Sequence, residues 1–205
     1  VFPATMCTGK CSKFIGISLF PFSIICIIAN ILLLFPGFGV EAIQDAGSRM
    51  TPEVLYLGGI IGGGFLVLIP AIHILATGQR KNCCNNRCGM FLSIIFAAIG
   101  LVGAVYALTV SAFGMVYGPV CEFRNSTGAL VWGQIFKDNI KNFSNESYLF
   151  NKDLWQLCEK PDNVAVFNIS LFSIVLTASA IEIILCVVQV VNGLAGCLCG
   201  TCQKK

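Results

Sequence analysis

The sequence predicts an all-α membrane protein, an antiparallel bundle of four transmembrane helices with a disulfide-fastened extracellular loop between the third and fourth helices. Four apolar stretches are each long enough to cross a hydrocarbon core of about 30 Å, which takes roughly 20 helical residues. Hydrophobic residues make up 56% of the chain and charged residues 11%, whereas about 25% of the residues in soluble domains are charged. Acidic and basic residues also fall on opposite sides of the four stretches.

The predicted spans alternate with segments outside the membrane. The spans cover 14–35, 55–76, 90–117 and 164–191. On one side lie the N-terminus 1–13, the loop 77–89 and the tail 192–205. On the other side lie a short loop, 36–54, and a large loop, 118–163. Because several connections are short, we expect successive spans to be antiparallel neighbours in a left-handed bundle.

The charges predict which side is cytosolic. Of the ten carboxylates, all but Glu182 fall in the two loops 36–54 and 118–163. The other three segments hold basic residues and no carboxylate. Since basic residues favour the cytosolic side, we expect both termini and the 77–89 loop in the cytosol. The net charge of +3 suits anionic lipid headgroups, and no basic–aromatic pattern indicates nucleic acid.

Cys121 and Cys158 are the two of the twelve cysteines that fall in the predicted extracellular loops. In an oxidising compartment we expect them to form a disulfide, which would remove about 4 kcal/mol of unfolded-state freedom in the chain-entropy model. The alternative is two free exposed thiols. Apolar residues at helical spacing over 148–158 predict a short helix there, with Trp155 packed inside the loop.

Eight further cysteines lie on the predicted cytosolic side, close to a span end and to Lys or Arg: Cys7, Cys11, Cys83, Cys84, Cys88, Cys197, Cys199 and Cys202. This setting favours reversible S-palmitoylation. A metal site is the rival interpretation, but the spacings CxxxC, CCxxxC and CxCxxC differ from paired CxxC knuckles and no cytosolic histidine joins them. A third interpretation is that these thiols are unmodified. We predict acylation and no metal, and interpret Cys26 and Cys186 as small core residues.

Three Asn-X-Ser/Thr sequons lie in the large loop, at Asn125, Asn142 and Asn145. Each supplies an acceptor for N-glycosylation on the extracellular side, so we expect at least one glycan. Asn168 also matches the pattern, but it falls at or inside the predicted membrane surface, where the transferase does not reach.

Polar side chains inside the spans are functional candidates by default. They are Asn30, His73, Glu182 and Gln189. The helical rise places Asn30 about 10 Å further out than Glu182, which argues against a direct pair, and places His73 and Gln189 near one level. Glu182 could brace the bundle, line a lipid or small-molecule pocket, or pass ions or protons. Bracing is favoured, because conduction pathways usually present a chain of carboxylates.

Overlapping GxxxG patterns mark the second span, at Gly58, Gly59, Gly62 and Gly63. Such small residues let helix backbones approach closely where hydrophobicity provides no driving force. They could serve packing within the bundle or association with another membrane protein, and we favour packing within the bundle.

Several short stretches together resemble the four-transmembrane L-six family: MCTGKC at 6–11, GIIGGG at 59–64, GPVC at 118–121, LWQLC at 154–158 and VNGLAGC at 191–197. The layout is similar to that of tetraspanins, but the Cys-Cys-Gly of tetraspanin loops and the paired cysteines of claudins are absent. The resemblance implies a multi-pass protein of the plasma membrane or the endosomal–lysosomal membrane. It also implies lateral partners such as integrins, receptors, transporters and tetraspanin-like proteins, with effects on adhesion, migration and signalling.

We therefore predict a membrane organiser or adaptor. The alternative is a lipid- or small-molecule-binding protein, or a transporter subunit, with an intramembrane cavity near Glu182. An enzyme is not expected, because the single histidine, His73, lies inside a span and no nucleophile–base–carboxylate set shares a compartment. No cofactor is predicted beyond a bound lipid or sterol. Membrane lipids are expected partners, and a homo-oligomer remains open.

Overall fold

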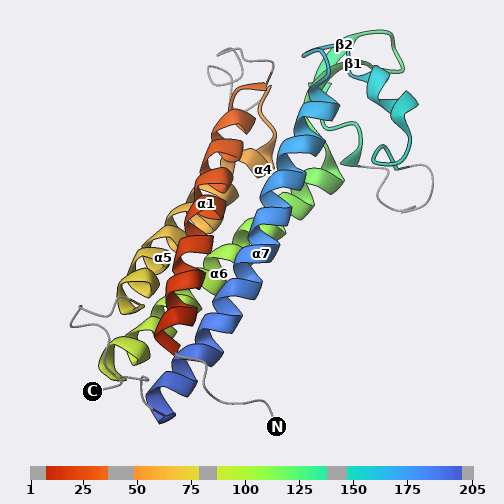
Figure 1. Cartoon of the computed structure of the whole chain (residues 1–205). Helices are drawn as coiled ribbons and strands as arrows, with labels where there is room; N and C mark the ends of the chain where they lie inside the picture. The colour runs from red at the N-terminus through yellow and green to blue at the C-terminus, as the bar shows by residue number, and fades with distance from the viewer. Residues whose placement is uncertain (1–7, 37–48, 79–86, 138–146, 200–205) are drawn as a thin grey trace.

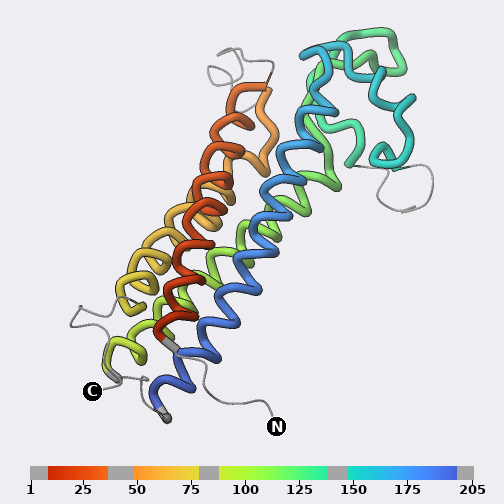
Figure 2. The backbone as a smooth tube through the Cα atoms, viewed as in Figure 1, coloured from red at the N-terminus to blue at the C-terminus, as the bar shows by residue number. Residues whose placement is uncertain are grey.

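The computed structural model describes residues 8–36, 49–78, 87–137 and 147–199. Within these residues, four segments are long and apolar enough to cross a membrane: Gly9–Leu33, Pro52–Thr77, Cys88–Tyr117 and Val164–Cys197. They lie side by side and alternate in direction along the chain (Figure 1, Figure 2). One end of the bundle, here called the outer end, carries a β-hairpin, and the predicted four-helix fold is confirmed.

The second span is a composite of three pieces, whereas the other spans are single helices. The single helices are α1 (Thr8–Leu33), α6 (Arg87–Tyr117) and α7 (Val164–Cys199). The second span joins a short helix, a π-helix and a longer helix: α4 (Pro52–Leu55), η2 (Gly58–Phe65) and α5 (Leu66–Thr77). The helices form a ring in which α1 packs against α5 and α7, and α6 packs against the same two.

The π-helix η2 is wedged between α1 and α6, and its glycines make this possible. Two of them face α6 and two face α1: Gly58 and Gly62, then Gly59 and Gly63. A Cβ on Gly62 would lie 2.6 Å from the carbonyl oxygen of Gly103 in α6. A Cβ on Gly59 would lie 2.7 Å from the carbonyl oxygen of Cys26 in α1. The η2 backbone therefore contacts the backbones of both α1 and α6, so the GxxxG patterns serve packing within the bundle of a single chain.

The fourth helix continues past Val191, where the hydropathy pattern predicts the end of the span, and reaches Cys199. The polar residue after Val191 does not end the helix, because Asn192 donates from Nδ2 to Ser12 Oγ at 2.9 Å inside the bundle. The two glycines that follow lie against α6, where a Cβ would come within 2.6 Å of Ile94 at Gly193 and 3.0 Å of Met90 at Gly196. Helix packing therefore extends the element where hydropathy alone marks a boundary.

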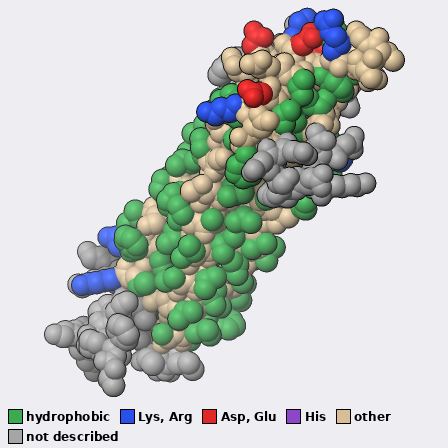
Figure 3. Space-filling model, turned by 90° about the vertical axis from the view of Figure 1, so that its right-hand side faces the viewer, with side chains coloured by type: hydrophobic (Ala, Val, Ile, Leu, Met, Phe, Trp, Pro, Cys, Tyr) green, Lys and Arg blue, Asp and Glu red, His purple; other side chains and the backbone are tan. Residues whose placement is uncertain are grey.

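The outward surface of the bundle is apolar over most of its length. Side chains such as Phe14, Val102 and Val191 are more than 60% exposed to their surroundings, at 68%, 68% and 62%. Figure 3 shows hydrophobic side chains along the helices and places the Asp and Glu side chains of this face at the outer end. This is the surface that a hydrocarbon environment requires.

The outer end carries a small module, residues 118–137 and 147–163, here called the outer module. Strands β1 (Cys121–Arg124) and β2 (Leu130–Gly133) pair antiparallel, with Cys121 opposite Gly133. The predicted disulfide between Cys121 and Cys158 is confirmed, with Cα atoms 5.5 Å apart. It joins the hairpin to the segment that leads into α7.

The helix predicted over 148–158 is shorter than expected and of the 3₁₀ type, η4 (Lys152–Leu157). Asn151 caps it by accepting from the Asp153 backbone N–H at 3.0 Å. Trp155 is half-buried, and its Nε1 donates to the Tyr148 carbonyl at 2.7 Å. Few residues separate this cap from the disulfide, so the segment closes in short 3₁₀ bonds in place of full α-helical turns.

Candidate functional site

The outer module is tied to the bundle by hydrogen bonds that reach both the second and the third spans. The donor–acceptor pairs are Gln134 Nε2 to Glu53 Oε2 at 2.9 Å, Val120 N to Thr51 Oγ1 at 3.2 Å, and the Tyr148 hydroxyl to the Met115 carbonyl. Thr51, Glu53 and Val120 are all buried. Because the acceptors are shielded from water, the module has a fixed seat on the ends of these spans.

Tyr148 is the aromatic residue around which the outer module packs against the end of α6. Its side chain is buried and stacks on Phe136, with ring centroids 4.2 Å apart. Gly118 has φ +74°, and a Cβ at this position would lie only 2.7 Å from the Phe136 ring. Burial raises the pKa of the Tyr148 hydroxyl, which therefore stays protonated and donates to the bundle. The module and the end of α6 thus share one small core.

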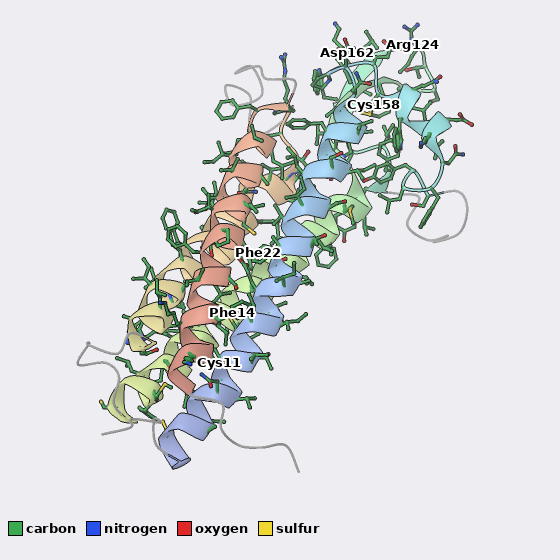
Figure 4. All side chains as sticks on the ribbon, in the orientation of Figure 1. Cys11, Phe14, Phe22, Arg124, Cys158 and Asp162 are labelled. Atoms are coloured by element: carbon green, nitrogen blue, oxygen red, sulfur yellow. A yellow bond between two sulfur atoms is a disulfide. The ribbon has the colours of Figure 1, made fainter. Side chains whose placement is uncertain are left out.

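The edge of the hairpin carries opposite charges that reinforce backbone pairing. The backbone N–H of Glu122 donates to the Lys160 carbonyl at 2.8 Å, and the Glu122 carbonyl accepts from the Glu159 N–H at 2.8 Å. The Lys160 ammonium lies 3.6 Å from the Glu122 carboxylate, and the exposed Arg124 lies 3.3 Å from Glu159. Figure 4 places Arg124, Cys158 and Asp162 together at the outer end. This ordered, charged face is open to solvent.

Asn125 lies at the tip of the hairpin and is exposed. Its side-chain Oδ1 accepts from the Ser126 backbone N–H at 2.7 Å, so the turn holds the sequon outward. Asn168, by contrast, is 3% exposed inside α7, where no transferase can reach it. The sequons at Asn142 and Asn145 lie outside the described residues.

Glu182 lies in the middle of the bundle and is completely buried. The Ser23 hydroxyl of α1 donates to its Oε1 at 3.4 Å, while Oε2 has no hydrogen-bond partner among the described residues. A Cβ on Gly63 would lie 3.2 Å from Oε2 and 2.9 Å from Cys26 Sγ. Helices from three spans therefore close around this carboxylate.

Asn30 occupies the layer above Glu182 and is also buried, against Gly59 of the second span. No hydrogen bond joins it to Glu182, and its Oδ1 has no partner in the described part of the chain. Both polar groups therefore lie where α1 packs against the second span, but at different depths along the helices.

Gln189 stands at the centre of a second polar layer near the inner end. Its Nε2 lies 3.1 Å from Ser12 Oγ of α1 and 3.1 Å from Ser93 Oγ of α6. His73 stacks on Phe96, three residues along α6 from Ser93, with ring centroids 4.4 Å apart, and its ring nitrogens have no partner among the described residues. The layer joins three helices through one amide.

The sequence interpretation missed the serines in these layers, although a periodic signal marks them. Ser12, Ser23 and Asn30 are separated by eleven and then seven residues, which are close to whole helical turns. Glu182 and Gln189 are likewise separated by seven residues on α7. Because the members of each row are separated by nearly whole turns, each row lies on one face of its helix, which favours an interface between the first and fourth spans.

The inner end presents the cysteines that the structure describes there. Cys88 is exposed, Cys11 is half-buried (Figure 4), and Cys197 lies near the end of α7. Outside the description are Cys7, Cys83, Cys84, Cys202 and the side chain of Cys199. Among the described residues, no group of three or more His, Cys, Asp or Glu side chains could hold a metal ion.

The comparisons with known proteins agree with this architecture. A model of the L6 membrane protein family matches residues 6–203. The chain belongs to the L6 membrane protein family. The bovine (Bos taurus) protein named transmembrane 4 L6 family member 5 is 42% identical over 205 residues, which cover 98% of this chain and 97% of the relative. No solved structure matches the chain.

Other L6 relatives match over similar lengths. The rat (Rattus norvegicus) protein named family member 4 is 41% identical, over 97% of this chain and 95% of its own length. The mouse (Mus musculus) protein named family member 1 is 37% identical, over 98% and 97%. The resemblance found in the short motifs is therefore confirmed, and this L6 protein is a tetraspanin-like, multi-pass membrane protein.

Proposed function

We propose that this L6 protein is a membrane organiser that binds other integral membrane proteins laterally, integrins, receptors, transporters and tetraspanin-like proteins among them, and thereby influences adhesion, migration and signalling. The proposal places it in the plasma membrane, or in endosomal–lysosomal membranes, with both termini cytosolic and the outer module extracellular. The positive-inside rule supports this orientation, because Lys10, Lys13 and Arg87 lie close to the inner ends of the spans and no carboxylate lies in the three inner segments.

The observation that carries the proposal is the fixed seat of the outer module. Gln134 bonds to Glu53 of the second span at 2.9 Å and to the carbonyl of Gly118, the residue directly after α6, at 3.2 Å, so one amide fixes the module against the second span. The charged face of the module is exposed to water, and the apolar surface of the spans is exposed to lipid. A membrane-protein partner can therefore contact both surfaces at once. Such preorganisation lowers the ordering cost of binding.

The polar groups in the membrane support a structural role over transport or catalysis. Glu182 is completely buried and accepts from Ser23, and Gln189 donates from Nε2 to two serine hydroxyls while its Oε1 accepts from Asn192. We assign bracing to Glu182 in place of the alternative ligand cavity. We also propose a non-enzymatic protein, since its one histidine, His73, stacks on Phe96 within a span.

We further propose that cysteines at the inner end are S-acylated. Cys88 is exposed at the start of α6, where an acyl chain could enter the bilayer directly. Acyl exchange with a mass tag should shift the wild-type protein in steps. Replacing all eight inner cysteines with serine should abolish the shifts, and an unshifted wild-type protein would argue for the metal site or for plain thiols.

The organiser role can be tested by proximity labelling in intact cells, with the labelling enzyme fused at the N-terminus. The wild-type protein should enrich a reproducible set of integrins, receptors or transporters. A chain whose charged hairpin edge is neutralised by Arg124→Gln, Glu159→Gln and Lys160→Gln should lose part of that set, because these side chains are exposed to solvent.

The matched control neutralises Lys152 and Asp153, which are exposed on η4, away from that edge. It should retain the wild-type neighbours. The proposal fails if the hairpin variant and this control label the same proteins as the wild type, or if the wild type labels no membrane protein above an unrelated four-span chain.

A further inference from the structure

A groove of about 450 Å³ opens on the side of the bundle, between the start of the second span and the outer end of α6. Its walls include one carboxylate, one ammonium and four aromatic rings, from Glu53, Lys137, Tyr56, Tyr106, Phe113 and Tyr117. Tyr56 and Phe113 are 59% and 49% exposed, so the groove is reached from the lipid side. Neither the fold nor the proposed function accounts for it.

The groove has a charged end and an apolar end. Glu53 lies at the level of Gly118, since Gln134 bonds to both, and this level is the outer end of α6. Tyr106 lies deeper and donates its hydroxyl to the Tyr56 carbonyl at 2.7 Å. From Tyr106 to Tyr117 the helix rises about 16 Å. The groove therefore runs from the membrane surface well into one leaflet.

The charged end matches a zwitterion. Gln134 holds Glu53 through Oε2, which fixes this carboxylate in the groove wall. The Lys137 ammonium lies 5.4 Å from the centroid of the Tyr117 ring. Tyrosine faces beside a carboxylate attract a quaternary ammonium, and a lysine ammonium binds a phosphate as a point charge.

We propose that the groove binds one phospholipid with a phosphocholine headgroup from the leaflet at the outer end. The trimethylammonium group lies between Glu53 and the Tyr56 ring, the phosphate meets Lys137, and an acyl chain follows Phe113 toward Tyr106. A partner helix is a poorer occupant, because it would have to supply both an acid and a base at one depth to match these two charges. A choline lipid carries both charges and the apolar tail in a single molecule.

Native mass spectrometry of the full-length protein, released from detergent micelles, tests this proposal. An equimolar mixture of lipids with identical acyl chains and choline, ethanolamine or glycerol headgroups provides the competitors. The choline lipid should be retained about fivefold better than the ethanolamine lipid. Glu53→Gln and Tyr56→Leu should each remove that preference, and Lys137→Met should lower retention of all three lipids.

The chain offers a matched control for each variant. Lys152 also lies over an aromatic ring, 6.0 Å from the centroid of Trp155, but away from the groove, so Lys152→Met should bind as the wild type does. Phe91 is 58% exposed at the other end of α6, so Phe91→Leu controls for Tyr56→Leu. Glu53→Gln keeps an oxygen that accepts from Gln134, and an unchanged melting temperature would show that the seat is intact.

Equal retention of the three headgroups by the wild type would overturn the proposal. So would Glu53→Gln and Tyr56→Leu variants that fold and keep the choline preference, or a choline lipid with a photoreactive acyl chain that labels the Phe91 region as strongly as the Phe113 region. The headgroup comparison is made in detergent and needs no lateral partner. Its failure is therefore distinct from failure of the organiser role.

Discussion

Glu182 is an ionisable side chain that the spans bury completely, and its contacts define what a substitution should do. The hydrogen bond to Oε1 comes from Ser23, and Oε2 faces Gly63 closely. We expect Glu182→Gln to keep the acceptor and the shape, and to change the free energy of unfolding by less than about 0.5 kcal/mol. Glu182→Leu should destabilise by about 0.6 kcal/mol, because the hydrogen bond between α1 and α7 is lost and Ser23 keeps only the Leu19 carbonyl of its own helix, 3.0 Å away, as an acceptor.

The midpoint of unfolding in an SDS titration measures both variants. Ser23→Ala serves as the control, since it removes the same bond from the other side and should match Glu182→Leu. A large loss of stability for Glu182→Gln alone would contradict bracing, because it would mean that the carboxylate does something that an amide cannot do.

Gln189 should contribute more to the stability of the bundle than Glu182. Its amide lies 3.1 Å from each of two serines, on α1 and on α6, and all three side chains are buried. We predict that Gln189→Leu lowers the unfolding free energy by about 1.2 kcal/mol, twice the average for one interhelical bond in a membrane. Ser93→Ala should cost about half as much, whereas Ser12→Ala also removes the acceptor of Asn192 and should cost about as much as Gln189→Leu, measured by the same titration. Equal values for Gln189→Leu and Glu182→Leu would contradict this ranking.

At the scale of elements, the π-helix η2 decides how closely the second span approaches its neighbours. A Cβ at Gly62 would meet the Gly103 carbonyl at 2.6 Å, and backbone cannot move aside as a side chain can. We predict that Gly62→Ala forces η2 and α6 apart and lowers the stability of the bundle by about 1–3 kcal/mol, as overpacking does in cores.

Gly100 provides the matched glycine for this test. A Cβ there would meet the Cys186 sulfur at 3.2 Å, and a side chain can adjust by a few tenths of an ångström. Gly100→Ala should therefore stay close to wild-type stability in the same SDS titration. A Gly62→Ala protein as stable as Gly100→Ala would show that η2 can shift without cost.

Across the whole molecule, the disulfide joins the hairpin to the segment that leads into α7. In the chain-entropy model, removing the bond raises the conformational entropy of the unfolded module and so destabilises the folded module by about 4 kcal/mol. The spans keep their own contacts. We predict that Cys158→Ser impairs delivery to the cell surface more than it perturbs the bundle. Surface biotinylation measures delivery, and limited proteolysis in membranes measures the protection of the spans.

The double variant Cys121→Ser with Cys158→Ser separates loss of the bond from exposure of an unpaired thiol. It should show the same delivery defect as Cys158→Ser. If both variants reach the surface at wild-type levels, the seat made by Tyr148, Gln134 and Thr51 suffices to hold the module, and the disulfide is dispensable for folding.

Sequence reasoning was sufficient to predict the class of this protein, the number and approximate extent of its spans, and the pairing of Cys121 with Cys158. These features follow from local properties: long apolar runs need a hydrocarbon environment, and two cysteines that share one loop in an oxidising compartment have each other as partners. The short motifs also identified the family.

Tertiary structure alone decided which polar groups meet, where helices end and how the outer module is held. Gln189 binds Ser12 and Ser93, not His73, because the rotation of each helix about its axis is set by packing against its neighbours and is invisible in a hydropathy profile. The fourth helix passes Val191 for the same reason, since the polar Asn192 finds a partner inside the bundle. The hydrogen-bond partners that packing supplies decide where these polar residues can lie, because burying a polar group costs free energy unless it is paired.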